Sequence, residues 1–206
     1  DMTMKAKNDA LQTIRLLLLA LESRMLAETK RLLLFKNLHP DQQYAAQNLL
    51  HYLVLRNEDI RELQEMLHIH GLSSLASAES HIHRQLQAIL ERLGHKYTRE
   101  QLDPCTYAFS KNGIEATSTE LFGERHTIDT PFIMVTLDVS FADNYQVIKK
   151  LLESGMNVAR INCAHDDEHT WLKMIRNVKK AVRNTGRSCK IYMDLAGPKI
   201  RVKLLN

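Results

Sequence analysis

Apolar residues in the first half of the chain recur every three or four positions, which is the spacing of an amphipathic helix. Turn signals divide this half at His39-Pro40-Asp41, at Gly71, and at Ser77 with Ser80. We therefore predict an all-α domain of about four helices over residues 1–101. The apolar positions are Leu11, Ile14, Leu18, Leu21, Met25, Leu49, Leu50, Leu53, Leu86, Ile89, Leu90 and Leu93.

The pattern weakens between residues 102 and 130. Pro104, Gly113, Gly123 and many Ser and Thr residues interrupt any periodic apolar face in this segment. Such a composition is typical of connecting chain, so we predict a linker here.

The last part of the chain, residues 131–206, changes to an alternation of strands and helices. Phe132 to Leu137 is a continuous apolar and β-branched run, typical of a strand covered on both faces, and Val158 to Ile161 and Lys190 to Met193 are similar. Helical patterns ending at Gly155 and Gly186 separate these runs. The order strand, helix, strand, helix, strand predicts a parallel α/β segment.

Three parallel strands make a small sheet with two open edges. We expect the α/β segment to be incomplete by itself, because parallel sheets are normally larger and covered on both faces. Exposed strand edges pair readily with other chains. The pattern therefore predicts homo-oligomerisation or aggregation, which light scattering would detect.

Composition and charge exclude some function classes. The formal net charge of +4 is spread along the chain rather than gathered in one block, which argues against a nucleic-acid partner. The longest apolar run, Leu16 to Leu21, is far shorter than a membrane span. Three widely spaced cysteines without a CxxC pair favour a reducing, cytoplasmic location.

Polar residues cluster where the second and third predicted strands end. Arg160, Asn162 and His165 follow the second strand, and Asp194 follows the third. Functional groups of parallel α/β folds gather at this edge, where Arg suits phosphate and side-chain oxygens suit hard cations. The sequence thus predicts a phosphate and cation site. The alternative is a purely structural, buried ion pair between Arg160 and Asp194.

Two motifs at these strand ends resemble those of pyruvate kinases. GMNVARINCAHD, residues 155–166, is similar to the family pattern GMNVARxNFSHG, and MDLAGPKIR, residues 193–201, is similar to LDxKGPEIR. The resemblance implies that residues 131–206 form the first three β/α units of a (β/α)8 TIM barrel, which makes the fold class α/β with a helical domain before it. It also implies transfer of a phosphoryl group from phosphoenolpyruvate to ADP.

The resemblance assigns roles only where positions match. A phosphate-contacting arginine, nucleotide contacts and monovalent-cation ligands can be carried over. The implied positions are Arg160 for the substrate phosphate, Asn162, His165 and Arg201 for the nucleotide, and Asn162, Asp194 and the Leu195 carbonyl for the cation.

Several positions depart from the family pattern. Ala164 replaces a serine that helps hold potassium, Lys199 replaces a glutamate, Asp166 replaces a glycine, and Asp138 and Val139 replace a Gly-Pro pair. Two interpretations stay open for K⁺: the Lys199 ammonium stands in for the ion, or both changes record decay of the site.

The resemblance places the family's catalytic lysine and its Mg²⁺ ligands on later barrel strands. We therefore expect no pyruvate kinase activity from these 206 residues alone, with phosphoenolpyruvate and ADP/ATP as ligands of the full-length protein. The alternative is a non-catalytic regulatory or binding protein, in which the helical domain is the functional part and the barrel segment is scaffold.

Four histidines form two HxH pairs on either side of Gly71. They are His68, His70, His81 and His83. Residues two apart on a helix point in different directions, so the spacing favours solvated or capping histidines over a metal site.

Overall fold

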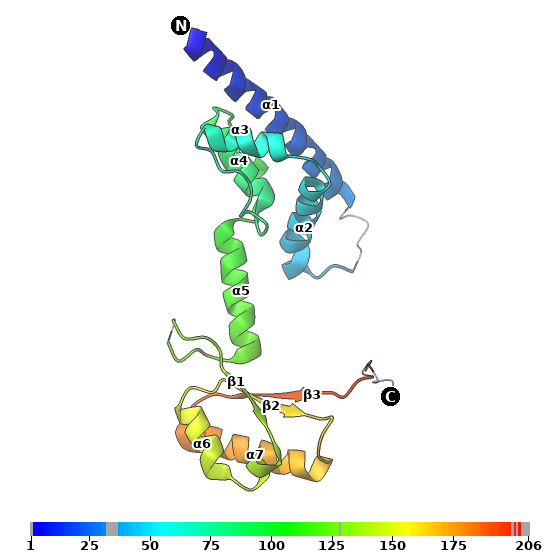
Figure 1. Ribbon diagram of the computed structural model, residues 1–206, viewed down its shortest axis with the longest axis vertical. Coiled ribbons are helices and arrows are strands. Elements are labelled where there is room, and N and C mark those ends of the chain that lie inside the picture. Colours follow the sequence, from blue (N-terminus) through cyan, green and yellow to red (C-terminus); the bar gives the residue numbers. More distant parts are fainter. Residues whose placement is uncertain (1, 32–36, 128, 199, 201, 203–206) are drawn as a thin grey trace. The chain divides into compact units, whose positions relative to one another are not determined.

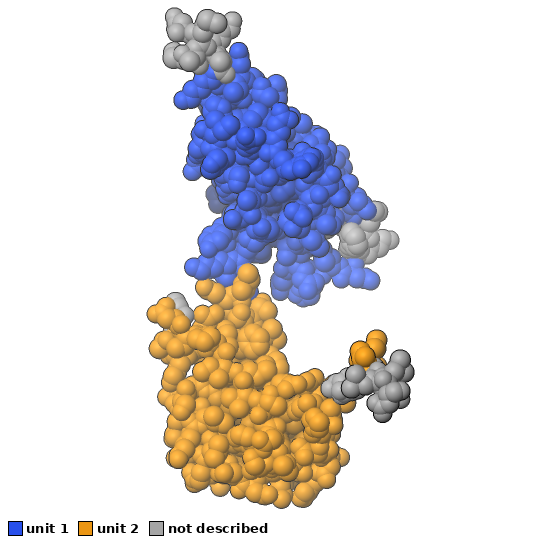
Figure 2. Space-filling model, viewed as in Figure 1, with its two compact units in different colours: residues 1–113 blue, residues 114–206 orange. Residues whose placement is uncertain are grey.

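The computed structural model describes residues 2–31, 37–127, 129–198, 200 and 202, with side-chain detail from residue 7 onward. Two compact units divide the chain, unit 1 with residues 1–113 and unit 2 with residues 114–206 (Figure 2). No helix in the described ranges is long and apolar enough to cross a membrane.

Unit 1 is helical, as the apolar periodicity predicts (Figure 1). Its core is a single cluster of buried aliphatic side chains that includes Ile14, Leu18, Leu67 and Leu86. Its elements are α1 (Met2–Thr29), η2 (Pro40–Gln42), α2 (Gln43–Arg56), α3 (Arg61–Ile69), α4 (Ile82–Arg92) and η3 (Arg99–Gln101).

The start of α4 depends on a residue from another helix. Ser77 and Ser80 give no side-chain cap to this helix, and its N-cap residue, His81, gives none either. Instead the Asn48 side chain, from α2, accepts a hydrogen bond from the Ile82 N–H at 2.9 Å and donates one to the Glu79 carbonyl at 2.7 Å. The cap is tertiary, so local sequence does not reveal it.

The segment predicted as a linker contains a sixteen-residue helix, α5 (Tyr107–Phe122). The Thr106 hydroxyl accepts a hydrogen bond from the Phe109 N–H at 3.0 Å at the start of α5, and Gly123, with φ +83°, ends it. None of its residues is buried, so α5 has no core face and leaves no periodic apolar signal.

Unit 2 contains a three-stranded parallel sheet in the order β1-β2-β3. Helices α6 and α7 lie along one side of the sheet (Figure 1) and share a core cluster with its strands. The elements are β1 (Met134–Leu137), η4 (Val139–Ala142), α6 (Tyr145–Glu153), β2 (Val158–Asn162), α7 (Glu168–Thr185) and β3 (Lys190–Asp194).

Coverage of the sheet differs from the expectation. Ile133 and Met134, from the run predicted to be buried on both faces, are 41% and 44% exposed. Leu137, on the face that packs against the helices, is buried. Among the described strands β1 and β3 form the two edges, and self-association through them stays a prediction.

Candidate functional site

Strand register brings the predicted polar residues to one face of the sheet. Thr136 on β1 pairs with Arg160 on β2, and Asn162 at the end of β2 pairs with Asp194 at the end of β3. Alternate residues of a strand share a face, so these four side chains lie opposite the residues that pack against α6 and α7. We call these four residues the strand-end cluster.

Arg160 connects the three strands. Its Nη1 donates a hydrogen bond to Thr136 Oγ1 at 2.9 Å, and its Nη2 forms an ion pair with Asp194 Oδ2. The side chains of Arg160 and Asp194 are 31% and 47% exposed. The pair is therefore open to solvent and is not the buried ion pair of the structural alternative.

The loop after β2 is held by short-range hydrogen bonds. Asn162 Oδ1 accepts a hydrogen bond from the Ala164 N–H at 3.1 Å, and the Cys163 N–H donates one to the Asp194 carbonyl at 2.9 Å. A carboxamide oxygen has two lone pairs, so Asn162 keeps one acceptor position for another ligand.

His165 and Asp166 continue this loop toward α7. The His165 carbonyl accepts a hydrogen bond from Trp171 Nε1 at 2.9 Å. His165 is an exposed residue. Asp166 has φ +63°, a left-handed conformation that glycine adopts without strain and that aspartate tolerates better than most residues. The replacement of the family's glycine thus keeps the turn.

The oxygen donors for a monovalent cation are few. Asp194 offers the carboxylate oxygen that does not face Arg160, and Asn162 offers its second lone pair. Leu195, whose carbonyl is the third predicted cation ligand, is 80% exposed. The other two predicted positions, Lys199 and Arg201, lie outside the described residues.

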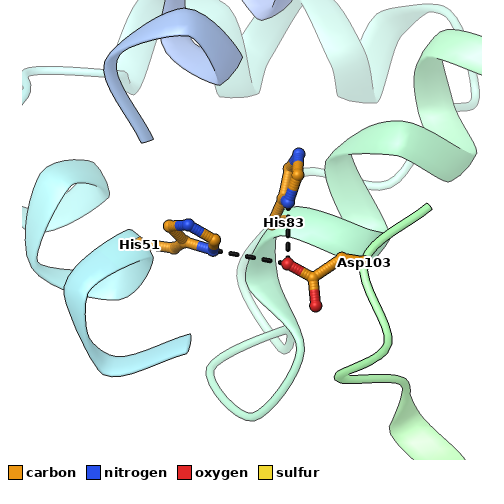
Figure 3. Close-up of side chains that lie close together, drawn as sticks. All are labelled: His51, His83 and Asp103. Carbon is orange, nitrogen blue, oxygen red and sulfur yellow. Dashed lines mark hydrogen bonds and ion pairs between the residues drawn. The ribbon is translucent and has the colours of Figure 1, made fainter. Parts of the chain in front are cut away.

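A second group of polar residues lies inside unit 1, and of its members the sequence indicated His83 alone. Glu22 on α1, His51 on α2, His83 on α4 and Asp103 after η3 are between 0% and 7% exposed. We call these four the buried polar cluster. His83 Nδ1 lies 2.8 Å from Asp103 Oδ2, and its Nε2 lies 2.9 Å from Glu22 Oε1. Figure 3 shows both imidazoles directed at the same Asp103 oxygen.

Neighbouring groups hold the two carboxylates in place. Tyr97 Oη donates a hydrogen bond to Glu22 Oε2 at 2.8 Å, and the Cys105 N–H donates one to Asp103 Oδ1 at 2.8 Å. Gln47 Nε2 donates to Asp103 Oδ2 at 3.1 Å. Both acids thus have several donors each, as buried carboxylates require.

The pKa values of the cluster follow from these contacts. Burial by itself would raise the pKa of both Glu22 and Asp103, but hydrogen bonds from His83 and other donors outweigh it and lower both values. Burial would lower the pKa of His83, but the two carboxylates raise it. Burial, together with the neighbouring His83 charge, lowers the pKa of His51 to about 4.

The prediction for the histidine pairs was wrong for one member. His83 is neither solvated nor a cap, since it is 3% exposed and bonded to two acids. His51 and Asp103 come from distant parts of the chain, so spacing gave no sign of them. The available signal was that Glu22, His51 and His83 are polar residues on helices, at positions that face the core.

Comparisons with known proteins concern unit 2. Residues 130–206 match the family described as "Pyruvate kinase, barrel domain". Pyruvate kinase of Geobacillus stearothermophilus is 38% identical over 60 residues, 29% of this chain and 10% of that protein. The cytosolic isozyme of Glycine max is 40% identical over 60 residues, 29% of this chain and 12% of that protein. No solved structure matches the chain.

The match is short but specific. Pyruvate kinase of Thermotoga maritima is 38% identical over 63 residues, 31% of this chain and 14% of that protein. The matching stretches thus span 10%, 12% and 14% of these three relatives. The family match covers the part of the chain in which both strand-end motifs occur. Residues 130–206 are therefore similar to the barrel domain of pyruvate kinases.

Proposed function

We propose that residues 131–206 form the first three β/α units of a pyruvate kinase (β/α)8 barrel. On this proposal, the full-length protein transfers a phosphoryl group from phosphoenolpyruvate to ADP. The main support is the position of Arg160 and Asp194, which come from adjacent strands and meet on the face of the sheet opposite its helices. In (β/α)8 enzymes the reacting groups gather at the carboxyl ends of the strands.

Arg160 is the proposed substrate-phosphate ligand. A guanidinium has five N–H donors, so the bonds from Nη1 to Thr136 and from Nη2 to Asp194 leave donors for phosphate oxygens. Phosphoryl transfer depends mainly on positioning and on neutralising charge. An arginine held by two neighbouring strands supplies both, because its charge is fixed before the substrate arrives.

The remaining roles extend this proposal. Asn162, His165 and Arg201 would contact the nucleotide, and Asn162, Asp194 and the Leu195 carbonyl would bind a monovalent cation unless the Lys199 ammonium replaces it. Mg²⁺ would be held by residues of later strands. The 206-residue chain alone would therefore show no turnover.

A chimera tests the proposal. Residues 130–206 would replace the equivalent segment of the Geobacillus stearothermophilus enzyme, and turnover of phosphoenolpyruvate and ADP would be followed with Mg²⁺, with and without K⁺. We expect measurable turnover, which Arg160→Ala reduces by about 10²–10³-fold in kcat/KM. The exposed Lys179→Ala on α7 is the matched control and should change little.

The chimera also separates the open interpretations. Equal turnover with and without K⁺ would favour the Lys199 ammonium as a substitute for the ion, and dependence on K⁺ would contradict it. A folded chimera without any turnover, whatever the cation, would contradict the enzyme proposal.

A second candidate function is a regulatory or binding role for the helical domain, with the barrel segment as scaffold. The observation that favours it is the ion pair itself, because Asp194 occupies part of the guanidinium that a substrate phosphate would use. An inactive but folded chimera is the result this candidate predicts.

A further inference from the structure

Three groups of the buried polar cluster are arranged as metal ligands. We propose that His51, His83 and Asp103 together bind one divalent transition-metal ion of the zinc class. One nitrogen of each imidazole and one oxygen of Asp103 lie within 4.8 Å of one another, and all three residues are buried (Figure 3). Two imidazole nitrogens and one carboxylate oxygen are ligands that Zn²⁺ prefers in proteins. This site is independent of the strand-end cluster and of the proposed phosphoryl transfer.

The first argument is an atom without a hydrogen-bond partner. The outer nitrogen of His51, Nε2, lies 2.6 Å from the Thr29 hydroxyl. His51 Nδ1 is buried, has no hydrogen-bond partner and lies 3.5 Å from Asp103 Oδ2. A buried polar atom without a partner is unusual, and an ion held between His51 and Asp103 would satisfy it.

The second argument is the outer partner of His83. Its Nε2 lies 2.9 Å from Glu22 Oε1, which fixes a proton on Nε2 and directs Nδ1 toward Asp103 and His51. Histidine ligands of zinc characteristically donate their other N–H to a carboxylate, which orients the ring and strengthens the ligand. Thr29 serves the same purpose for His51, so both imidazoles are held by an outer hydrogen bond.

The distances require only small movements. An ion about 2.0–2.1 Å from each ligand in tetrahedral geometry keeps the ligand atoms about 3.3 Å apart. The separations from Asp103 Oδ2 are 2.8 Å to His83 Nδ1 and 3.5 Å to His51 Nδ1, on either side of that value. All three ligand atoms lie within 4.8 Å of one another, so the proposal requires the two imidazoles to move toward each other when the ion binds.

The test uses the untagged 206-residue chain, freed of metal and titrated with Co²⁺ alone and then with Zn²⁺ alone. We expect one ion per chain, the visible absorption of tetrahedral Co²⁺, and its loss when Zn²⁺ displaces the Co²⁺. Zn²⁺ at 100 times its Kd should raise the Tm of the helical signal by about 10 °C.

Two variants separate this site from surface histidines. His51→Leu removes the unbonded nitrogen and should abolish the Co²⁺ spectrum, whereas the double variant His68→Ala/His70→Ala should keep it. Circular dichroism checks that each variant is folded, and His51→Asn is the substitute if His51→Leu is not. Absence of Co²⁺ and Zn²⁺ binding, or binding that survives in a folded His51 variant, overturns the proposal.

Discussion

The two polar clusters of this chain differ in how far water reaches them. In unit 1, His83 and Asp103 have side chains 3% and 2% exposed, whereas in unit 2 those of Arg160 and Asp194 are 31% and 47% exposed. Both contain an acid paired with a basic side chain. The same kind of contact therefore has different energetic consequences in the two units.

Burial decides how much free energy is lost when one partner of the pair is removed. A buried ion pair gains strong attraction but loses the hydration of both charges, so removal of one partner leaves the other uncompensated. A pair near solvent gains little, and its groups can exchange partners with a ligand at small cost. The strand-end cluster is thus suited to bind and release a substrate phosphate, while the buried polar cluster is suited to hold a fixed structure or a permanent ion.

The largest expected effect comes from removing one acid in each cluster. Asp103→Ala removes one of the two acids that contact the buried His83, and we expect a loss of about 3–5 kcal/mol in the free energy of unfolding. Asp194→Ala should cost at most about 1 kcal/mol. Urea unfolding in the presence of EDTA measures both, by circular dichroism and by the fluorescence of Trp171, the single tryptophan, which lies in unit 2.

Asp103→Asn is the matched control, because it keeps the shape and an acceptor oxygen and removes only the charge. Its effect should lie between those of the wild type and Asp103→Ala. The contrast between the clusters would be refuted by equal losses for Asp103→Ala and Asp194→Ala.

Two asparagine helix caps, one buried and one exposed, allow the same comparison with smaller expected losses of stability. Asn48 is 9% exposed and bonds the Ile82 N–H and the Glu79 carbonyl, whereas Asn144 accepts one exposed hydrogen bond from the Val147 N–H at 3.3 Å. Asn48→Ala leaves two such groups without a partner, and we expect a loss of about 2 kcal/mol. Asn144→Ala should cost about 0.5–1 kcal/mol.

Chemical denaturation of both cap variants gives these values. Asn48→Asp, which keeps the acceptor for the Ile82 N–H but loses the donor to Glu79, should be intermediate. A loss for Asn144→Ala as large as that for Asn48→Ala would show that burial does not set the strength of these caps.

Local patterns predicted elements that have both a core face and a local stop. The three strands of unit 2 and the helix ends at Gly155 and Gly186, with φ +104° and +68°, were visible in the sequence because period and turn chemistry agree there. Helix α5 was missed for the opposite reason. Its caps at Thr106 and Gly123 are local, but it buries no residue.

The two polar clusters also differed in how well the sequence pattern predicted them. Arg160 and Asp194 follow predicted parallel strands, and the carboxyl ends of such strands share an edge, so their proximity followed from the pattern. His51 and Asp103 lie 52 positions apart and meet only through the packing of α2 and α4 with the segment after η3. No periodic rule gives that contact, because it depends on how the helices cross.

The smallest expected effect concerns the two faces of the sheet in unit 2. Cys189 packs against the core on the helix-covered face, opposite the face that carries Arg160. Burial raises its thiol pKa from 9.0 to about 11. A higher pKa means less thiolate at every pH below it, partly offset by a more nucleophilic thiolate, so alkylation at pH 8 should be about 10-fold slower than for a free thiol. Iodoacetamide labelling from pH 7 to 11.5, read by mass spectrometry of the Cys189 peptide, should show a rate still rising near pH 11. A plateau reached above pH 9 would mean that water reaches the helix-covered face of unit 2 as freely as it reaches Arg160, and the contrast between the two faces would fail.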